Sequence, residues 1–421
     1  MLTTGPRGTH DITPGEAKNW RRVEEAARKI CALYHYGEIR TPIFEHTELF
    51  LRGIGETTDV VQKEMYTFTD RGGRSVTLRP ENTAAVVRSY LEQKLYADSQ
   101  AAKLFYIGPM FRYDRPQAGR LRQFHQFGIE AIGPVGPSVD AEIILLAVRF
   151  FESLGLTNLN LLINSVGCPK CRPQYRLLLQ DFLRDKQADL CENCQSRFDR
   201  NPMRILDCKE EKCNRLSAGA PQMVDCLCDE CAAHFAGLQQ YLNAAGITYT
   251  LNPRLVRGLD YYTKTAFEIQ YPSLGAQSAI CGGGRYDGLI EECGGPATPG
   301  IGFAIGLERV LLAMEKQELL GSAEDTLPVW VIPIGAEAML PALSLLNQLR
   351  DAGIASDMDH GGKSLKSQMK QANRLGARTV VMIGEEEARI NQVTLKNMET
   401  GEQTRLSAID AINQLKQEMN G

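Results

Sequence analysis

Apolar residues recur at helical spacing between residues 16 and 36, which predicts an amphipathic helix at the start of the chain. The next stretch, EIRTPIFE (38–45), has the composition of a strand that is interrupted at Pro42. Two short apolar runs within 65–80 flank glycine-containing turn residues, and we predict a β-hairpin there. ENTAAVVRSYLEQK (81–94) then begins a helix.

Two longer apolar runs, 103–114 and 122–133, are predicted to form strands joined by an arginine-rich loop. A helix at 139–155 and a strand at 159–167 follow. Antiparallel hairpins mixed with helices are typical of an α+β domain, and this is the fold class that we expect.

The segment 168–231 is polar and interrupts this pattern, so we interpret it as an insertion. After it, we expect a long strand pair at 251–271 and a glycine-rich turn, CGGGRYDGL, at 281–289. A strand that runs into a helix is predicted at 300–316.

Periodicity lapses in the polar stretch EKQELLGSAEDTLP, and we place a domain boundary between residues 323 and 324. Beyond it, strands alternate with helices, which predicts a small α/β domain at 324–421.

The composition is that of an ordinary globular protein, with 43% hydrophobic and 23% charged residues. No apolar run reaches the roughly 18 residues of a membrane span, and the amino-terminal residues lack the apolar core of a signal peptide. We therefore expect a cytoplasmic protein without a membrane partner. A net charge of −4 means that any polyanion must be met by local basic patches.

The loop between the two longer strands carries Arg112, Arg115, Arg120 and Arg122. Guanidinium groups match phosphate oxygens in pairs and keep their charge, so this loop is a candidate clamp for a polyphosphate. The alternative is a solvated hairpin tip.

Two carboxylates stand out beside these strands. Glu81 at the start of a helix either complements the helix dipole or has a function. Glu130 alternates with apolar neighbours in a strand, at a position from which its side chain points into a cleft, and a carboxylate there needs a partner.

Polar groups also gather in the carboxy-terminal half of the first domain. Arg257, Tyr261 and Tyr262 lie within six residues, a density that a plain core strand would avoid. The glycines of 282–284 either admit a ligand close to the backbone or only form a tight turn. Arg309 is a cation at a strand–helix junction, or an ordinary surface arginine.

These segments together resemble a known family. EIRTPIFE, FRYDRPQAGRLRQFHQFGIE and GIGFAIGLERV resemble, in order, the three signature motifs of class II aminoacyl-tRNA synthetases. LVRGLDYYTKTAFE and ICGGGRYDGL are similar to the two motifs that distinguish histidyl-tRNA synthetases within that class, and PRGTHDI is also typical of them. The resemblance runs from about Pro6 to the end of the chain.

The resemblance implies a catalytic domain with an antiparallel sheet and helices at 1–323, and an α/β anticodon-binding domain at 324–421. It also implies that the protein activates L-histidine with ATP and Mg²⁺ to histidyl-adenylate, and then transfers the histidyl group to the 3′ end of histidine tRNA. The family's first motif forms a dimer interface, so a homodimer is expected.

Residue roles are likewise implied by the resemblance. The expected catalytic residues are Arg257 and Arg112. The expected ATP-binding residues are Arg112, Arg120 and Arg309. The expected histidine-binding residues are Glu81, Thr83, Gln126, Glu130, Tyr261, Tyr262 and Tyr286.

The second domain contains an acid-free basic stretch between His360 and Gly384. Its cations recur every three or four residues: Lys363, Lys366, Lys370, Arg374 and Arg378. One charged helix face would suit a phosphate backbone, so we predict that it binds tRNA; the alternative is a solvated face.

Nine of the twelve cysteines lie in the insertion, which favours metal ligands or reduced thiols over disulfides. Cys168-x₂-Cys171 and Cys191-x₂-Cys194 have the spacing of a four-cysteine zinc site, and we predict a structural zinc bound by these four residues. The remaining five cysteines either form a second site or mix with the first. The alternative is a set of thiols that bind no metal.

Two other functions are alternatives for this sequence. One is the synthetase-like regulatory subunit of histidine biosynthesis, which lacks the carboxy-terminal domain and the intact arginine motif. The other is a synthetase for another amino acid, which Glu130 and the tyrosines disfavour because they suit imidazole.

Overall fold

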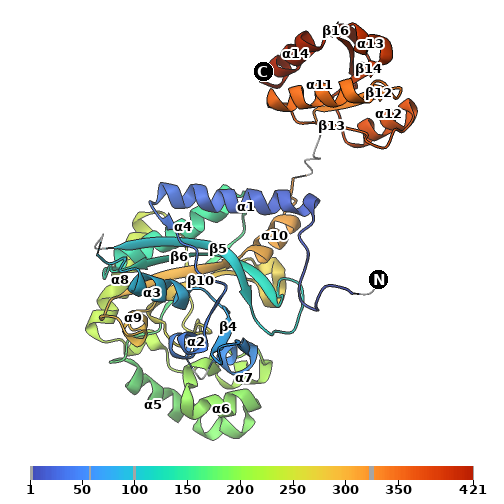
Figure 1. Cartoon of the computed structure of the whole chain (residues 1–421). Coiled ribbons are helices and arrows are strands. Elements are labelled where there is room, and N and C mark those ends of the chain that lie inside the picture. Colours follow the sequence, from blue (N-terminus) through green and yellow to red (C-terminus); the bar gives the residue numbers. More distant parts are fainter. Residues whose placement is uncertain (1–2, 56–57, 98–100, 322–326, 421) are drawn as a thin grey trace. The chain divides into compact units, whose positions relative to one another are not determined.

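The computed structural model describes residues 3–55, 58–97, 101–321 and 327–420. The chain forms two compact units, Met1–Leu320 and Gly321–Gly421 (Figure 1). The predicted boundary between residues 323 and 324 lies outside the described residues.

The first unit is built on an eight-stranded sheet in the order β1-β5-β6-β11-β10-β9-β7-β8. Only the outer pairs, β1 with β5 and β7 with β8, are parallel. The strands are β1 (Gly37–Glu38), β5 (Ala102–Phe111), β6 (Gln123–Ile132), β7 (Asn160–Ser165), β8 (Thr250–Leu251), β9 (Thr263–Gln270), β10 (Ala279–Arg285) and β11 (Gly300–Gly306).

Helices cover one face of this sheet (Figure 1). They are α1 (Pro14–Leu33), α4 (Pro137–Ser153), α8 (Asp229–Ala244) and α10 (Leu307–Lys316). Their apolar sides pack on the core-facing residues of the strands, among them Phe127 and Ile129 of β6 and Phe267 of β9. Because side chains alternate along a strand, Gln126 and Glu130 of β6 point to the opposite face.

That opposite face is bordered by short helices and a small sheet. The helices are α2 (Thr47–Ile54), α3 (Thr83–Glu92) and α9 (Leu289–Glu292). The small antiparallel sheet has the order β2-β4-β3, with β2 (Phe44–His46), β3 (Tyr66–Thr69) and β4 (Ser75–Leu78). The α+β class is therefore confirmed, as are the hairpin predicted at 65–80 and the two long antiparallel strands β5 and β6.

Two local predictions were wrong. The predicted glycine-rich turn is strand β10, in which Gly282, Gly283 and Gly284 pair with both neighbouring strands. The predicted long strand pair at 251–271 contains only the end of β8 and the strand β9, because an irregular loop that begins at Asn252 lies between them. The two departures are connected, since this loop folds over Gly282 and Gly284, where Cβ atoms would meet Arg257 and Tyr262. A Cβ atom at Gly283 would instead meet Phe267 and the Gly302 carbonyl.

The insertion is made of short helices. They are α5 (Arg172–Leu183), α6 (Glu192–Arg200) and α7 (Glu211–Leu216), with 3₁₀ turns between them. Its small core combines apolar residues such as Tyr175, Leu179 and Phe198 with buried cysteines.

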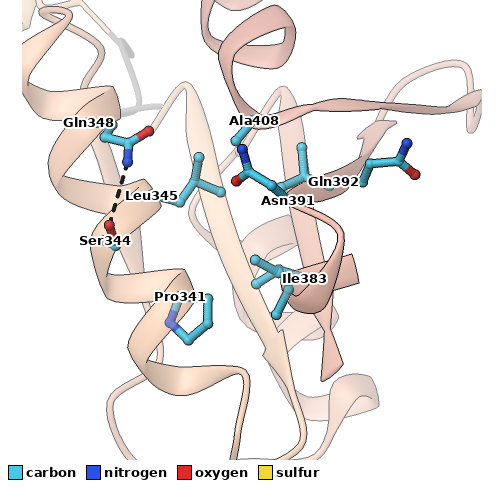
Figure 2. A pocket seen from close by; sticks show the side chains of 10 residues that line it. Pro341, Ser344, Leu345, Gln348, Ile383, Asn391, Gln392 and Ala408 are labelled. Carbon is cyan, nitrogen blue, oxygen red and sulfur yellow. Dashed lines mark hydrogen bonds between the residues drawn. The ribbon is translucent and has the colours of Figure 1, made fainter. Parts of the chain in front are cut away.

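The second unit contains a five-stranded sheet in the order β13-β12-β14-β15-β16. Its strands are β12 (Val329–Ile334), β13 (Ser356–Met358), β14 (Thr379–Gly384), β15 (Gln392–Asn397) and β16 (Gln403–Ser407). Its helices are α11 (Met339–Asp351), α12 (Leu365–Arg374), α13 (Glu385–Arg389) and α14 (Ala408–Asn420). A cavity of about 160 Å³ lies between α11 and β15 and is lined by side chains such as Leu345, Gln348 and Ile383 (Figure 2). None of the predicted site residues lines it.

No described helix has the length and apolar character needed to cross a membrane.

Candidate active site

A buried carboxylate lies at the centre of the polar face of the large sheet. Glu130 of β6 is 1% exposed, and its two oxygens accept hydrogen bonds from Thr83 Oγ1 (2.8 Å) and Tyr286 Oη (2.5 Å). Burial raises the pKa of Glu130 to about 8, although these two hydrogen bonds partly oppose the shift. Glu130 forms no ion pair with a described residue, so it is suited to a ligand that donates a proton or carries positive charge.

The beginning of α3 lies beside this carboxylate. Glu81 accepts hydrogen bonds from the backbone N–H groups of Thr83 (2.6 Å) and Ala84 (3.0 Å), so it does complement the helix start. Burial nevertheless raises the pKa of Glu81, while the charge of Arg112 acts to lower it. On β6, the side-chain oxygen of Gln126 is buried and has no hydrogen-bond partner among the described residues. These acceptors suit an ammonium group.

Tyrosines enclose the same space. The ring of Tyr261 lies 4.7 Å from that of Tyr262 and 5.9 Å from that of Tyr286, measured between centroids. Tyr106 of β5 covers Gly128, where a Cβ atom would fall 2.1 Å from the Tyr106 ring. Aromatic rings packed around the Glu130 carboxylate are surroundings that suit a small, flat and polar side chain.

Arg257 lies directly over strand β10. A Cβ atom at Gly282 would fall 1.8 Å from Arg257 Nη2, so only glycine leaves room for the guanidinium there. Arg257 donates to Glu268 Oε2 of β9 (2.5 Å), while its buried Nε lacks a hydrogen-bond partner among the described residues. Burial alone would lower the pKa of Arg257, but the charge of Glu268 raises it.

Three further arginines gather beside the predicted loop. Arg112 donates to the Pro80 carbonyl (2.8 Å), and Arg120 pairs with Asp114. Arg309, in the first turn of α10, donates to the carbonyls of Gly119 (2.9 Å) and Ala279 (2.7 Å). Neither Arg112 nor Arg309 forms an ion pair with a described residue.

The positive charges of Arg112 and Arg120 affect the pKa of Arg309. Burial lowers the pKa of this residue, and the nearby charges of Arg120 and Arg112 lower it further. Three neighbouring cations, of which only Arg120 pairs with a described acid, suit a multiply charged anion.

The structure thus brings Gln126, Glu130 and the three predicted tyrosines together, with Glu81 and Thr83 at the start of α3 beside them. Arg257 lies over Gly282 of β10, and Arg112, Arg120 and Arg309 gather beside the loop after β5.

Three features were not predicted from the sequence: Glu268, Tyr106 and the buried pair of Asp140 with Arg285, in which Arg285 Nε donates to Asp140 Oδ1 at 3.1 Å. Glu268 carried a detectable signal, because it is a lone acid in an apolar strand, as Glu130 is. Tyr106 carried none, since its role depends on Gly128 in the neighbouring strand.

The basic stretch of the second unit is only partly helical. Lys366, Lys370 and Arg374 are exposed on α12 and form no ion pair with a described residue. Lys363 precedes the helix and pairs with Asp359 (3.0 Å), and Arg378 follows it. The predicted single helix face therefore carries three of the five cations.

The predicted zinc ligand set was wrong in its grouping. Cys168 and Cys171 cluster with Cys228 and Cys231, whereas Cys191 and Cys194 cluster with Cys208 and Cys213. Helix α5, with 12 residues and a length of about 18 Å, follows Cys171 and carries the chain away from it. Cysteines that follow later in the sequence complete each group.

The mostly antiparallel sheet, with one arginine beyond the end of β5 and another in the helix after β11, defines a class II aminoacyl-tRNA synthetase fold. A family model described as histidyl-tRNA synthetase matches residues 8–310, and one described as anticodon binding domain matches 328–418. The chain belongs to the histidyl-tRNA synthetase family.

Individual relatives agree with this assignment. The histidine–tRNA ligase of Pelotomaculum thermopropionicum is 56% identical over 421 residues, which cover 100% of this chain and 99% of the relative. That of Desulforamulus reducens is 57% identical over 407 residues, or 97% of each chain. The crystal structure of apo histidyl-tRNA synthetase from S. aureus superposes with a TM-score of 0.83 at 43% identity, covering 99% of this chain and 100% of that one.

Proposed function

We propose that this protein is a histidine–tRNA ligase. It activates L-histidine with ATP to form histidyl-adenylate, and then transfers the histidyl group to the 3′ end of histidine tRNA. The observation that carries the proposal is the buried carboxylate of Glu130, packed among tyrosines, in the same unit as Arg112 and Arg309, which form no ion pair with a described residue.

In the first step, a carboxylate oxygen of histidine forms a bond to the α-phosphorus of ATP. The bond from that phosphorus to the bridging oxygen breaks, and pyrophosphate leaves. No proton needs to move, so catalysis requires alignment and stabilisation of negative charge. We assign both tasks to Arg112 and Arg257, because each is anchored through one nitrogen and keeps other donors for the phosphate.

The outer phosphates are assigned to Arg120 and Arg309. Arg309 is held by backbone carbonyls, which fix its position without neutralising its charge. Mg²⁺ enters with ATP as part of the substrate, as in other synthetases of this family. Asp114 keeps Arg120 in place until phosphate replaces it.

Histidine is proposed to bind with its imidazole at Glu130. A ring N–H donates to the carboxylate, and the ring packs between Tyr261, Tyr262 and Tyr286. A side chain that cannot donate leaves the buried acid with only Thr83 and Tyr286 as hydrogen-bond partners, and the lost hydrogen bond, roughly 1–3 kcal/mol, gives selectivity. The α-amino group is assigned to Glu81, Thr83 and Gln126, since the oxygen of Gln126 is buried and unpaired.

In the second step, an oxygen of the terminal ribose forms an ester bond to the histidyl carbonyl carbon, the bond from that carbon to the phosphate oxygen breaks, and AMP leaves. The hydroxyl proton is released to the leaving phosphate or to water. The tRNA must also contact the second unit, and we assign this to Lys363, Lys366, Lys370, Arg374 and Arg378. The exposed ammonium groups of α12 support this role because no described acid neutralises them.

A homodimer in the cytoplasm completes the proposal. Ile43 and Phe44, within the segment that resembles the first class II motif, are 44% and 52% exposed although apolar. Apolar residues exposed side by side favour an interface with a second copy. Sedimentation equilibrium should give twice the chain mass, and Phe44→Glu should shift it toward the monomer.

The rival function is the regulatory subunit of histidine biosynthesis, which does not charge tRNA. The arginine motif with Arg257 and the presence of the second unit both favour the ligase. The experiment is to charge a histidine tRNA transcript with labelled histidine in the presence of ATP and Mg²⁺. Acid-stable label on the tRNA supports the ligase, and its absence, with histidine still bound, supports the regulatory function.

A further inference from the structure

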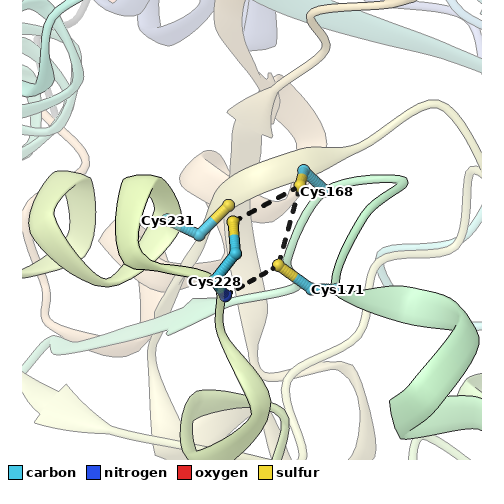
Figure 3. A group of neighbouring side chains, drawn as sticks. All are labelled: Cys168, Cys171, Cys228 and Cys231. Atoms are coloured by element: carbon cyan, nitrogen blue, oxygen red, sulfur yellow. Dashed lines mark hydrogen bonds between the residues drawn. The ribbon is translucent and has the colours of Figure 1, made fainter.

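The insertion contains two compact groups of four cysteines. One, here called the outer site, consists of Cys168, Cys171, Cys228 and Cys231; the other, the inner site, consists of Cys191, Cys194, Cys208 and Cys213. In each group all sulfur atoms lie within 4.8 Å of one another. Figure 3 shows the four side chains of the outer site turned toward a common centre.

The sulfur separations match a tetrahedral ion. Zinc–sulfur bonds of about 2.3 Å place neighbouring sulfurs about 3.8 Å apart. The Sγ atom of Cys168 lies 3.6 Å from that of Cys171 and 3.9 Å from that of Cys228, and the Sγ atoms of Cys191 and Cys208 are also 3.9 Å apart. A disulfide would require about 2.05 Å, and a cluster of several irons would hold its cysteines further apart.

Backbone groups are arranged as expected around bound thiolates. The N–H groups of Cys228 and Cys191 donate to the sulfurs of Cys171 (3.2 Å) and Cys213 (3.3 Å). Glu210 N–H donates to the sulfur of Cys208 at 3.4 Å. Such bonds orient the sulfur and offset its negative charge, which thiols packed only as small apolar groups do not need.

We propose that the insertion binds two zinc ions, one in each site, through four thiolates each. Both sites are closed, with four protein ligands, so their role is structural and not catalytic. Zinc provides the cross-links that the short helices α5, α6 and α7 need, because their shared apolar core is small.

The outer site lies where the two ends of the insertion join the rest of the first unit. Its ligands come from the turn after β7 and from the start of α8, so the ion joins the two ends of the segment. Arg172, which follows Cys171, donates to the backbone carbonyls of Val166 (3.1 Å) and Tyr262. The ion thereby fixes the backbone of a tyrosine that lines the histidine pocket.

A second connection runs through α8. His234, one turn after Cys231, bonds to Asp140 (2.8 Å), and Asp140 pairs with the buried Arg285 next to Tyr286.

The inner site is linked to the loop that carries Arg257. Between its two halves, Asn201 donates to Asp260 (2.9 Å) and Arg204 donates to the Gly258 carbonyl (2.8 Å). Both sites therefore position backbone beside the proposed active site, the outer one at Tyr262 and the inner one at residues 258–260. This positioning role rests on the proposed function, whereas the metal content does not.

The first test is the zinc content of the full-length protein, purified without added metal and measured by inductively coupled plasma mass spectrometry. Two zinc ions per chain are expected, with one each in Cys171→Ser and Cys208→Ser. Cys226→Ser is the matched control, because Cys226 belongs to neither site, and it should retain two.

If a variant does not fold, the number of bound zinc ions can still be measured on the wild-type protein. A mercurial reagent titrated against the native chain should release two zinc ions as eight thiols react, followed with a chromophoric chelator. Zinc at one ion per chain or less, or iron in its place, would overturn the proposal.

Histidine kinetics test the positioning role. Cys171→Ser and Cys208→Ser should each raise KM for histidine severalfold, whereas the control Cys226→Ser should leave it unchanged. An unchanged KM in both zinc-depleted variants would overturn the positioning role while leaving the metal count intact.

Discussion

Tyr286 donates a 2.5 Å hydrogen bond to Glu130 across strand β11, whose residues between the two side chains are glycines. Glu130 belongs to β6 and Tyr286 follows β10, and β11 lies between these strands. A Cβ atom at Gly300 would fall 2.1 Å from the Tyr286 ring, and one at Gly302 would fall 2.2 Å from Glu130 Oε2. The two glycines of β11 thus allow the side chains of Tyr286 and Glu130 to come into contact. This hydrogen bond holds the Glu130 carboxylate among the tyrosines.

Glu130→Gln should weaken histidine binding far more than ATP binding. The amide keeps the shape but loses a charge-assisted hydrogen bond to imidazole, so KM for histidine should rise roughly tenfold to a hundredfold. Separate Michaelis constants from pyrophosphate exchange measure this, with the exposed Glu399→Gln as control. An equal rise in both constants would place Glu130 outside the histidine pocket.

The same substitution should change how stability depends on pH. The pKa of Glu130 is about 8 in the folded chain, above its ordinary value of 4.5, so the folded state holds a proton that the unfolded state releases between these values. Stability from this group is therefore full below pH 4.5 and is lost as pH rises through 8. We expect the Tm of Glu130→Gln, relative to wild type without ligands, to increase from pH 5 to pH 8.5. A pH-independent difference would contradict the raised pKa.

Arg257→Ala should reduce adenylate formation by about 10²–10³-fold, because it removes a cation aimed at charge that develops at the α-phosphate. The readout is pyrophosphate exchange at saturating substrates, with circular dichroism to check the fold. Arg149→Ala, at an exposed arginine on α4, is the control. Activity within a few-fold of wild type would remove Arg257 from the catalytic assignment.

Gly282→Ala should impair the same step without touching a charged residue. The new methyl group would fall 1.8 Å from Arg257 Nη2 and displace the guanidinium, so pyrophosphate exchange should drop by at least about tenfold. Gly288→Ala provides a matched comparison, since its nearest neighbour would be 3.9 Å away. Equal pyrophosphate exchange by Gly282→Ala and Gly288→Ala would mean that adenylate formation does not depend on the observed position of Arg257.

Reversing Lys366 and Lys370 to Glu should weaken tRNA binding and flatten its salt dependence. Loss of about two phosphate contacts lowers the slope of log K against log salt by roughly 1.4 to 1.8. Histidine activation without tRNA should stay near the wild-type rate. Lys416→Glu, exposed on α14, should leave tRNA binding nearly unchanged. An unchanged slope in the double variant would mean that α12 presents only a solvated face.

The sequence predicts well the features that depend on periodicity. The alternation around Glu130 correctly separates the core side of β6 from its polar side, and the hairpin and the two long strands lie where the pattern puts them. The class II motifs likewise depend on local spacing.

Features that depend on contacts between residues distant in sequence could not be predicted from periodicity or local spacing. Strand β10 was predicted as a turn because glycine favours turns. The loop that carries Arg257 and Tyr262 explains why residues 282 and 284 of this strand are glycines. The two cysteine groups were mixed because Cys168 and Cys228 are 3.9 Å apart in space but 60 positions apart in the chain. Spacing alone cannot pair such distant turns.

The most direct test of the central claim is ATP–pyrophosphate exchange measured separately with each standard amino acid. The account predicts rapid exchange with L-histidine, near-background exchange with every other amino acid, and loss of the histidine signal in Arg257→Ala but not in Arg149→Ala. Exchange with a different amino acid, or none with histidine in a folded protein that contains its metal, would contradict it.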